Sequence, residues 1–263
     1  IGHINLASLG FLQRGIELGR RVAALAADPP RGTRRIHALR AFPEGVIAAV
    51  GRRLAGARST SLITYAHGEE LIVAESSRQL ALLARWAYSS SDLVIANSVN
   101  TQRLVRSMCP RARVEVVHPG VDTLQFRPRG SDARRELRAR FNWRDDQFVL
   151  VSVSRMEPRK NQETVIRAVA QLVESGMDVV FCCAGDGETR PSLEALASAR
   201  SRQARVAFPG RISDEDKALF MAGADAHVMV SVRAGQMIEG FGIVFIEAAA
   251  SGPELRFKSF LIE

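Results

Sequence analysis

The sequence has few cysteines and no long apolar run. Its three cysteines, Cys109, Cys182 and Cys183, lack the spacing of a metal site, and the last two are adjacent in an apolar segment. No stretch reaches the roughly 18 consecutive apolar residues of a membrane-spanning helix, and the first residues lack the basic region and cleavage pattern of a signal peptide. We therefore expect reduced, structural thiols in a soluble cytoplasmic protein.

Three common catalytic signatures are also missing. The sequence contains no Ser-His-Asp ordering, no histidine-rich metal cluster and no Walker loop. These absences disfavour a hydrolase, a metalloenzyme and a nucleoside triphosphatase. We expect a site without a metal and without a bound cofactor.

Lysine is absent from the first half of the chain. Residues 1–130 carry 18 arginines and 9 acids, a net charge of +9, so the total of +8 leaves −1 for the remainder. A surface this basic would attract anionic lipid or nucleic acid, or it is a solvated surface without a partner. Because no nucleic-acid motif accompanies the charge, we expect no nucleic-acid partner and keep peripheral contact with the inner face of a membrane as the alternative.

The second half of the chain alternates apolar runs with amphipathic segments. The expected strands are 148–153, 179–184, 206–208 and 226–230, and the expected helices are 162–174, 191–199, 214–223 and one after Gly242. This alternation is typical of a parallel, doubly wound α/β sheet.

The first half is less regular but of the same type. The expected strands are 62–66, 93–96 and 114–117, and the expected helices are 10–27, 76–87 and 101–108. A polar stretch begins near residue 130 and reads as a linker followed by a short helix. We expect two Rossmann-like α/β domains, 1–130 and 131–263, that face each other across a cleft.

Two acids, Glu239 and Glu247, bracket a Gly-Phe-Gly turn before an apolar helix. Glu239 falls in the loop and Glu247 about two turns inside the helix. The backbone N–H groups of Phe241, Gly242 and Ile243 would point from the helix start, where the dipole favours a phosphate. The acids could grip the hydroxyls of a sugar nucleotide. The alternative is that Glu239 only complements the helix dipole and that Glu247 is a solvated helix residue.

A basic loop, residues 154–161, joins an expected strand to an expected helix. Arg155 offers a planar fork for phosphate oxygens, and Lys160 offers a mobile point charge. Both would stabilise the negative charge that grows on a departing nucleoside diphosphate. The alternative is a pair of solvent-facing loop charges.

Other polar or small residues follow strands. Gly185 opens a Gly-Asp-Gly turn that lacks the third glycine of a dinucleotide fingerprint, so we interpret it as structural, packing beside a nucleotide. Arg211 and Ile212 form a strand-end turn whose backbone would bind a base edge or serve as an ordinary connection. His67 follows a strand and precedes a glycine, so its ring either donates to a sugar or phosphate oxygen or is a satisfied polar group.

Taken in order, these segments resemble the family-4 retaining glycosyltransferases of the GT-B fold. The segments that carry the resemblance are 65–70, 96–98, 117–122, 126–128, 155–160, 184–187 and 239–247. Their order and spacing agree with the family across about residues 60–252. Each motif is weak alone, but the combination is specific.

The resemblance implies roles for the candidate residues. Both cations of the basic loop would bind the donor diphosphate, and Glu247 would bind the ribose hydroxyls. Glu239, with the backbone of Phe241 and Gly242, would contact the transferred hexose, and His67 would lie near that sugar from the acceptor domain. The family retains the anomeric configuration by front-face attack, in which the leaving phosphate takes the acceptor proton, and usually needs no metal.

The sequence departs from the family pattern at both ends. The strand and glycine-rich loop with which the family normally begins have no clear equivalent, and residues 253–263 read as an unrelated tail. We therefore expect both domains to be incomplete, the second truncated after about residue 252.

Three hypotheses follow. The first is a hexosyltransferase that uses a nucleotide sugar, such as a UDP- or GDP-hexose, and a glycan or lipid-linked acceptor. The second is a weak or inactive fragment that only binds the nucleotide sugar or associates with membrane. The third, a nucleic-acid binder, rests on charge alone and predicts steep salt dependence. Turnover of the donor separates the first from the second.

Overall fold

The chain forms two compact units in a computed structural model that describes residues 9–27, 34–56, 60–75, 77–200, 205–232 and 241–252. Unit 1 is Ile1–Pro119 and unit 2 is Gly120–Glu263. The division falls earlier than the position near residue 130 that the sequence suggested. Phe126 explains the difference, because its ring is buried among Ala218, Met221 and Ala248 of unit 2.

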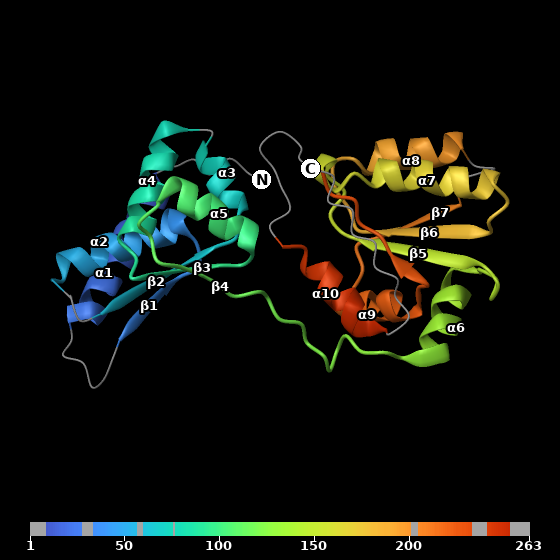
Figure 1. Cartoon of the computed structure of the whole chain (residues 1–263), viewed down its shortest axis with the longest axis horizontal. Helices are drawn as coiled ribbons and strands as arrows, with labels where there is room; N and C mark the ends of the chain where they lie inside the picture. The colour runs from blue at the N-terminus through green and yellow to red at the C-terminus, as the bar shows by residue number, and fades with distance from the viewer. Residues whose placement is uncertain are drawn as a thin grey trace. The chain divides into compact units, whose positions relative to one another are not determined.

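Unit 1 is built on a four-stranded parallel sheet (Figure 1). Its strands are β1 (Arg35–Ala38), β2 (Ser61–Ala66), β3 (Leu93–Ala96) and β4 (Val114–Val116), in the order β1-β2-β3-β4. Alternate residues of β2 and β3 are buried, as half-covered strands require. The described strands of this sheet therefore follow one another across it in a single direction.

The helices of unit 1 cover this sheet and one another. They are α1 (Leu9–Ala27), the short π-helix η1 (Ala41–Gly45), α2 (Val46–Leu54), α3 (Glu69–Glu75), α4 (Arg78–Ser89) and α5 (Val99–Met108). Helix α5 begins where Ser98 caps it, because the Ser98 hydroxyl accepts from the Thr101 N–H at 3.1 Å. Tyr88 and Val94 are fully buried in the core between the helices and the sheet.

Four elements of unit 1 were not predicted, namely β1, η1, α2 and α3. Strand β1 lies in an arginine-rich segment and, among the strands that the structure describes, pairs only with β2, so it carries little apolar alternation. Helix α2 is short and ends in Arg52 and Arg53, which made it resemble a charged surface segment. Helix α3 begins shortly after the end of β2, in a segment to which the sequence analysis assigned no element.

Unit 2 contains a second parallel sheet. Its strands are β5 (Phe148–Val153), β6 (Val179–Ala184), β7 (Val206–Gly210) and β8 (Ala226–His227), in the order β7-β6-β5-β8. Strand β8 is shorter than the expected 226–230. The Val228 N–H still donates to the Val151 carbonyl at 2.9 Å, but the chain then leaves the sheet and the Val232 N–H donates to the Arg159 carbonyl at 2.8 Å.

Helices cover both faces of this sheet (Figure 1). They are α6 (Gly130–Phe141), the 3-10 turn η2 (Pro158–Lys160), α7 (Gln162–Glu174), α8 (Arg190–Ala199), α9 (Asp214–Gly223) and α10 (Ile243–Ser251). Cys183 belongs to the core shared with α7 and α8, and Cys182 to the core shared with α6 and α9. Burial raises the pKa of the Cys183 thiol to about 12 and also raises the pKa of the Cys182 thiol.

A buried ion pair ties α6 to the start of two strands. Arg138 is 1% exposed, and its Nη2 donates to Asp225 Oδ2 at 2.7 Å and to the Gln147 carbonyl at 3.0 Å. Its Nη1 donates to the Gly223 carbonyl at 3.2 Å. Asp225 Oδ2 also accepts from the Val149 N–H at 2.7 Å. Removal of either charged partner would leave buried polar groups without compensation.

The substitution Arg138→Met is expected to lower the free energy of unfolding of unit 2 by about 3 kcal/mol, because it leaves the Gln147 and Gly223 carbonyls without their donor and Asp225 with the partly exposed Arg134 as its remaining cation. Urea unfolding monitored by circular dichroism measures the loss. The matched control is Arg167→Met, which removes an exposed partner of Glu163 and should cost less than about 1 kcal/mol. Equal losses in the two variants would contradict the assigned role of the buried pair.

Candidate functional site

Strands β5 and β8 lie side by side at the point where the strand order of unit 2 reverses. From β5 the chain passes through α7 and α8 to β6 and β7, and it returns to β8 through α9 on the opposite face (Figure 1). Open α/β sheets bind their ligands at the carboxyl ends of the strands beside such a reversal. We call this place in unit 2 the switch point.

The basic loop leaves β5 at the switch point. Lys160 is only 9% exposed, and its Nζ lies 3.7 Å from the Sδ of Met229, which follows β8. The interpretation of Lys160 as a solvent-facing charge is therefore wrong. Arg155 is 60% exposed, and Glu157 binds both Arg155, at 3.4 Å, and the buried Arg159, at 2.6 Å. Of the two cations that the sequence assigned to one diphosphate, Arg155 is exposed and Lys160 is buried. The Glu157 carboxylate lies between Arg155 and Arg159.

Gly185 and Gly187 hold the basic loop against the end of β6. A Cβ on Gly185 would lie 1.9 Å from the Ser154 carbonyl oxygen, and one on Gly187 would lie 2.2 Å from the Met156 carbonyl oxygen. Gly185 also has φ +132°, which L side chains rarely adopt. The Met156 N–H donates to the Asp186 carbonyl at 2.9 Å. The interpretation of Gly185 as structural fits this packing, and the glycine turn positions the cations.

Helix α10 begins at the switch point. Gly242 precedes it with φ +75° and, as a glycine, offers no side chain to cap the first turn. A Cβ on Gly242 would lie 2.8 Å from the Phe245 ring and 3.6 Å from Met229, the residue that contacts Lys160. Phe241 is half-buried and Ile243 is exposed at the helix start. Glu239 lies outside the described residues.

Glu247 is buried in the second turn of α10, so the interpretation of this residue as a solvated helix acid is wrong. Its side chain is 10% exposed. Lys217 of α9 places its Nζ 2.6 Å from Oε1 and 2.5 Å from Oε2. The carboxylate that the sequence singled out therefore has a fixed counter-charge from a neighbouring helix.

His227, in β8, is a buried imidazole beside this ion pair. Both of its ring nitrogens lack a hydrogen-bond partner among the described residues, and its ring meets the Phe245 ring edge to face at 5.9 Å. Burial, with a smaller contribution from the Lys217 charge, lowers the pKa of His227 to about 4. The imidazole is therefore neutral at physiological pH.

Arg211 and Ile212 follow β7, next to the end of β6. Arg211 is exposed, whereas Ile212 is half-buried and packs against the core that α9 covers. The Gly210 carbonyl, just before Arg211, accepts from the Gly185 N–H at 2.8 Å. The structure thus gives Ile212 a packing role and leaves the Arg211 side chain in solvent.

In unit 1, His67 stands at the carboxyl end of β2. The ring nitrogen Nε2 of His67 lies 2.9 Å from the Leu39 carbonyl oxygen. The backbone N–H of His67 donates to Glu70 Oε1 at 2.8 Å. Its carbonyl accepts from Asn97 Nδ2 at 3.1 Å. A carbonyl only accepts, so Nε2 carries a ring proton, and in the neutral tautomer Nδ1 presents a lone pair. The ring is exposed, and its geometry suits an acceptor toward a ligand hydroxyl.

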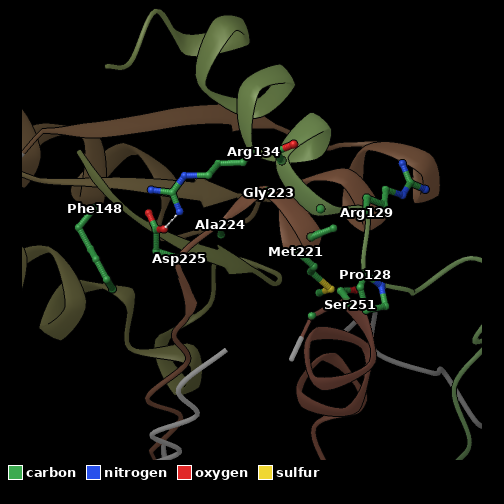
Figure 2. A pocket seen from close by; sticks show the side chains of 13 residues that line it. Pro128, Arg129, Arg134, Phe148, Met221, Gly223, Ala224, Asp225 and Ser251 are labelled. Atoms are coloured by element: carbon green, nitrogen blue, oxygen red, sulfur yellow. Dashed lines mark hydrogen bonds and ion pairs between the residues drawn. The ribbon is translucent and has the colours of Figure 1, made fainter. Parts of the chain in front are cut away.

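A cavity of about 460 Å³ lies at the other end of the second sheet, beside the start of β5 and β8 (Figure 2). Its wall includes Phe148 and the ion pair between Arg134 and Asp225. None of the candidate residues lines it. In the parts of the chain that the structure describes, no three His, Cys, Asp or Glu side chains come together as metal ligands.

Lys217 and His227 were missed by the sequence reasoning. Lys217 occupies the fourth position of a helix whose first turn is acidic, so it reads as an ordinary surface charge. His227 lies in an apolar strand, where nothing in the sequence separates a buried histidine from its neighbours. Only the packing of α9 against α10 brings Lys217 to Glu247, and the same lysine acts through its charge on His227.

Gly185→Ala is expected to destabilise unit 2 by about 3 kcal/mol or more, because the new methyl group meets a backbone carbonyl that cannot move without the basic loop. Gly176→Ala is the control, since Gly176 has φ +90° but no atom within 4 Å of the added methyl; it should cost about 1 kcal/mol from backbone strain alone. Chemical denaturation of both variants tests the difference, and similar losses would show that only φ matters.

His227→Phe is expected to raise stability and flatten its dependence on pH. The folded-state pKa of about 4 lies below the ordinary 6.5, so between these values the unfolded chain binds a proton that the folded protein does not. Wild-type stability therefore falls as the pH drops through this window, by up to about 3 kcal/mol.

Thermal unfolding at pH 7.5 and 5.0 measures this effect. Phe keeps a ring against Phe245 and removes both unpartnered nitrogens. His118→Gln, at an exposed histidine, should keep the wild-type pH dependence. An unchanged slope in His227→Phe would contradict a neutral buried imidazole.

Two family sequence models match adjoining parts of the chain. The model described as "Glycosyltransferase Family 4" matches residues 13–125. The model described as "Glycosyl transferases group 1" matches residues 133–253. Together they cover both units in the order that the family shows.

Characterised proteins of similar sequence include two mycobacterial enzymes. The GDP-mannose-dependent alpha-(1-6)-phosphatidylinositol monomannoside mannosyltransferase of Mycolicibacterium smegmatis is 31% identical over 214 residues, which are 81% of this chain and 55% of that protein. The D-inositol 3-phosphate glycosyltransferase of Mycobacterium bovis is 35% identical over 165 residues, 62% of this chain and 33% of that protein. The matched part of the chain thus spans about half the length of the first relative and about a third of the length of the second.

Solved structures of similar fold include two further proteins. Anabaena Alr3699/HepE, in complex with UDP and glucose, has a TM-score of 0.70 at 24% identity, with 93% of this chain and 63% of that chain covered. Sucrose-phosphate synthase from Thermosynechococcus elongatus has a TM-score of 0.67 at 22% identity, with 94% and 62% covered. These likenesses support the two-unit α/β fold that the resemblance predicted. By its sequence matches in both units, the chain belongs to the group 1, family-4 glycosyltransferases.

Proposed function

We propose that this chain carries the donor site of a glycosyltransferase that moves a hexose from a nucleotide sugar to a glycan or lipid-linked acceptor, with retention of configuration. The observation that carries the proposal is the arrangement at the switch point of unit 2. The buried cation Lys160 and the amino end of α10 meet there through Met229 and Gly242, and Glu247 lies in the second turn of the same helix. A diphosphate with an attached ribose has the charges and hydroxyls that these groups complement.

The diphosphate is proposed to lie between the basic loop and the start of α10. Arg155 and Lys160 would bind its oxygens, and the backbone N–H groups near Phe241, Gly242 and Ile243 would add the positive end of the helix dipole. These donors stabilise the leaving group most when its bond to the sugar breaks and its charge grows. Because two side-chain cations serve this purpose, the proposed reaction uses no metal.

The nucleoside is proposed to extend along the same edge of the sheet. The Glu247 carboxylate would accept hydrogen bonds from the ribose hydroxyls, and the backbone at Arg211 and Ile212 would meet the base edge beside Gly185. Glu239 is proposed for the hexose hydroxyls. His67, with its Nδ1 lone pair exposed, is proposed to accept from a sugar hydroxyl on the acceptor side.

Retention is proposed to follow from attack on the face from which the diphosphate leaves. The acceptor oxygen forms a bond to the anomeric carbon while the bond from that carbon to the phosphate oxygen breaks. The acceptor proton passes to the departing phosphate oxygen, so that the products are the glycoside and a protonated nucleoside diphosphate. Arg155 and Lys160 would hold that phosphate in place during the transfer.

The relatives favour particular donors without fixing one. The M. smegmatis protein is named for GDP-mannose, and the Anabaena structure holds UDP and glucose. We therefore propose a GDP- or UDP-hexose as the donor. The base contacts proposed at Arg211 and Ile212 are largely backbone, so side-chain identity there does not select the base.

A lipid-linked acceptor is the proposal that the basic first half supports. The 18 arginines of residues 1–130 would attract the anionic inner face of a membrane. None of the helices in the described parts of the chain is long and apolar enough to cross a membrane. Binding to vesicles with and without anionic lipid would test peripheral contact.

Calorimetric titration with UDP, GDP and ADP tests the donor site. One nucleotide is expected to bind saturably, and Glu247→Ala and Arg155→Ala should each weaken it by about tenfold or more, because each removes a charge-assisted hydrogen bond. Arg167→Met, on the solvated face of α7, should bind like the wild type. A folded protein that binds none of the three nucleotides would contradict the proposal.

Turnover separates an enzyme from a binding fragment. Incubation with UDP-glucose and GDP-mannose should release the matching diphosphate slowly if the chain is catalytic. Binding without release would favour the fragment hypothesis, in which the chain holds the donor but does not transfer its sugar.

A further inference from the structure

We infer that Lys217 is a positioning residue of the donor site, which holds the Glu247 carboxylate in a fixed orientation for the ribose hydroxyls. The inference rests on the proposed function, because it assigns Glu247 to the ribose. Lys217 belongs to α9 and Glu247 to α10, so the contact joins two helices that flank the switch point.

The contact between the two side chains is close and shielded from solvent. The Lys217 Nζ lies 2.6 Å from Oε1 and 2.5 Å from Oε2 of Glu247, with the lysine side chain 23% exposed. The ammonium group donates a hydrogen bond to Oε1 and forms an ion pair with Oε2, which makes no hydrogen bond among the described residues, so the lysine restricts rotation of the carboxylate. Because the pair is largely removed from water, its electrostatic coupling is stronger than that of a surface pair.

Phe126 limits the movement of the lysine from another direction. The Lys217 Nζ lies 5.4 Å from the centroid of the Phe126 ring, a distance at which a cation is attracted to an aromatic face. Phe126 is itself buried against Ala218, Met221 and Ala248, which belong to the two helices that carry the ion pair. The ammonium group is therefore held between a carboxylate and a ring, each anchored in the core.

His227 does not compete with Lys217 for the carboxylate. Burial keeps its imidazole neutral, and the Lys217 charge reinforces this effect. Its ring packs edge to face against Phe245 of α10. The positive charge that neutralises Glu247 in this cluster is therefore that of Lys217, and loss of Lys217 has no replacement from His227.

The consequence for binding follows from the chemistry of the carboxylate. An ionised carboxylate can accept a hydrogen bond from each of the two ribose hydroxyls. A neutral carboxyl group has one O–H donor and therefore fewer acceptor positions for these hydroxyls. A buried carboxylate that loses its cation partner is free to turn away from its ligand toward water. Without Lys217, the proposed ribose contact is lost while the diphosphate contacts at the basic loop remain.

Titration calorimetry of four variants tests this inference. The variants are Lys217→Met, Lys217→Arg, Glu247→Gln and the double variant Lys217→Met/Glu247→Gln, with Arg167→Met as the control for loss of a cation. The probes are UDP, GDP and ADP, their 2′,3′-dideoxy analogues, and inorganic pyrophosphate. Circular dichroism checks that each variant folds. If Lys217→Met fails to fold because Glu247 is left without its cation, the double variant can still be measured, because it buries no unpaired charge.

Lys217→Met is expected to lower the affinity for the preferred ribonucleotide about tenfold, which is the effect of losing one charge-assisted hydrogen bond. Its affinities for the dideoxy analogue and for pyrophosphate should stay within about twofold of the wild-type values. Lys217→Arg should restore most of the affinity. The double variant should bind as weakly as Glu247→Gln alone, because a residue that acts through Glu247 adds nothing once Glu247 is altered.

Two results would overturn the inference. One is an equal loss for ribonucleotide, dideoxy analogue and pyrophosphate in Lys217→Met, which would mean that the lysine acts as a general charge. The other is a double variant markedly weaker than Glu247→Gln, which would mean that Lys217 contacts the ligand directly. A wild-type protein that binds no nucleotide would instead refute the proposed function and this inference with it, whereas failure of the inference alone leaves wild-type binding intact.

Discussion

The buried ion pair between Arg138 and Asp225 sets the geometry on which the candidate site depends. Asp225 precedes β8, and its carboxylate binds both the Arg138 guanidinium of α6 and the Val149 N–H of β5. The position of β8 beside β5 is thereby fixed at the amino end of the strands. Because a strand is stiff over so few residues, the same contact determines where the chain emerges at the carboxyl end, and hence where the switch point lies.

At the carboxyl end the site is assembled by close backbone contact rather than by long side chains. Gly185 and Gly187 allow the end of β6 to touch the basic loop, and Gly242 allows α10 to begin against Met229. The cation at Lys160 is placed by this packing. The Lys217–Glu247 contact adds a further requirement, because α9 and α10 must pack in one relative position for the lysine to reach the carboxylate and orient it.

The sequence predicted most of unit 2 because apolar strands and amphipathic helices alternate there, and β5, α7, β6 and α9 have the expected bounds. It missed β1 because an edge strand with one neighbour needs little apolar pattern. Motif order identified the family and its candidate residues. It could not show that Glu247 is buried or that Lys217 faces it, because these facts arise from contacts between helices that no local pattern encodes.

The adjacent cysteines of β6 face opposite cores, since neighbouring residues of a strand point to opposite faces of the sheet. Their sulfurs cannot approach to disulfide distance without a break in the strand. Both thiols are also protonated at physiological pH, and only thiolates react readily. Alkylation of this pair would therefore record opening of the central sheet, with one sulfur reporting on each of the two helical layers.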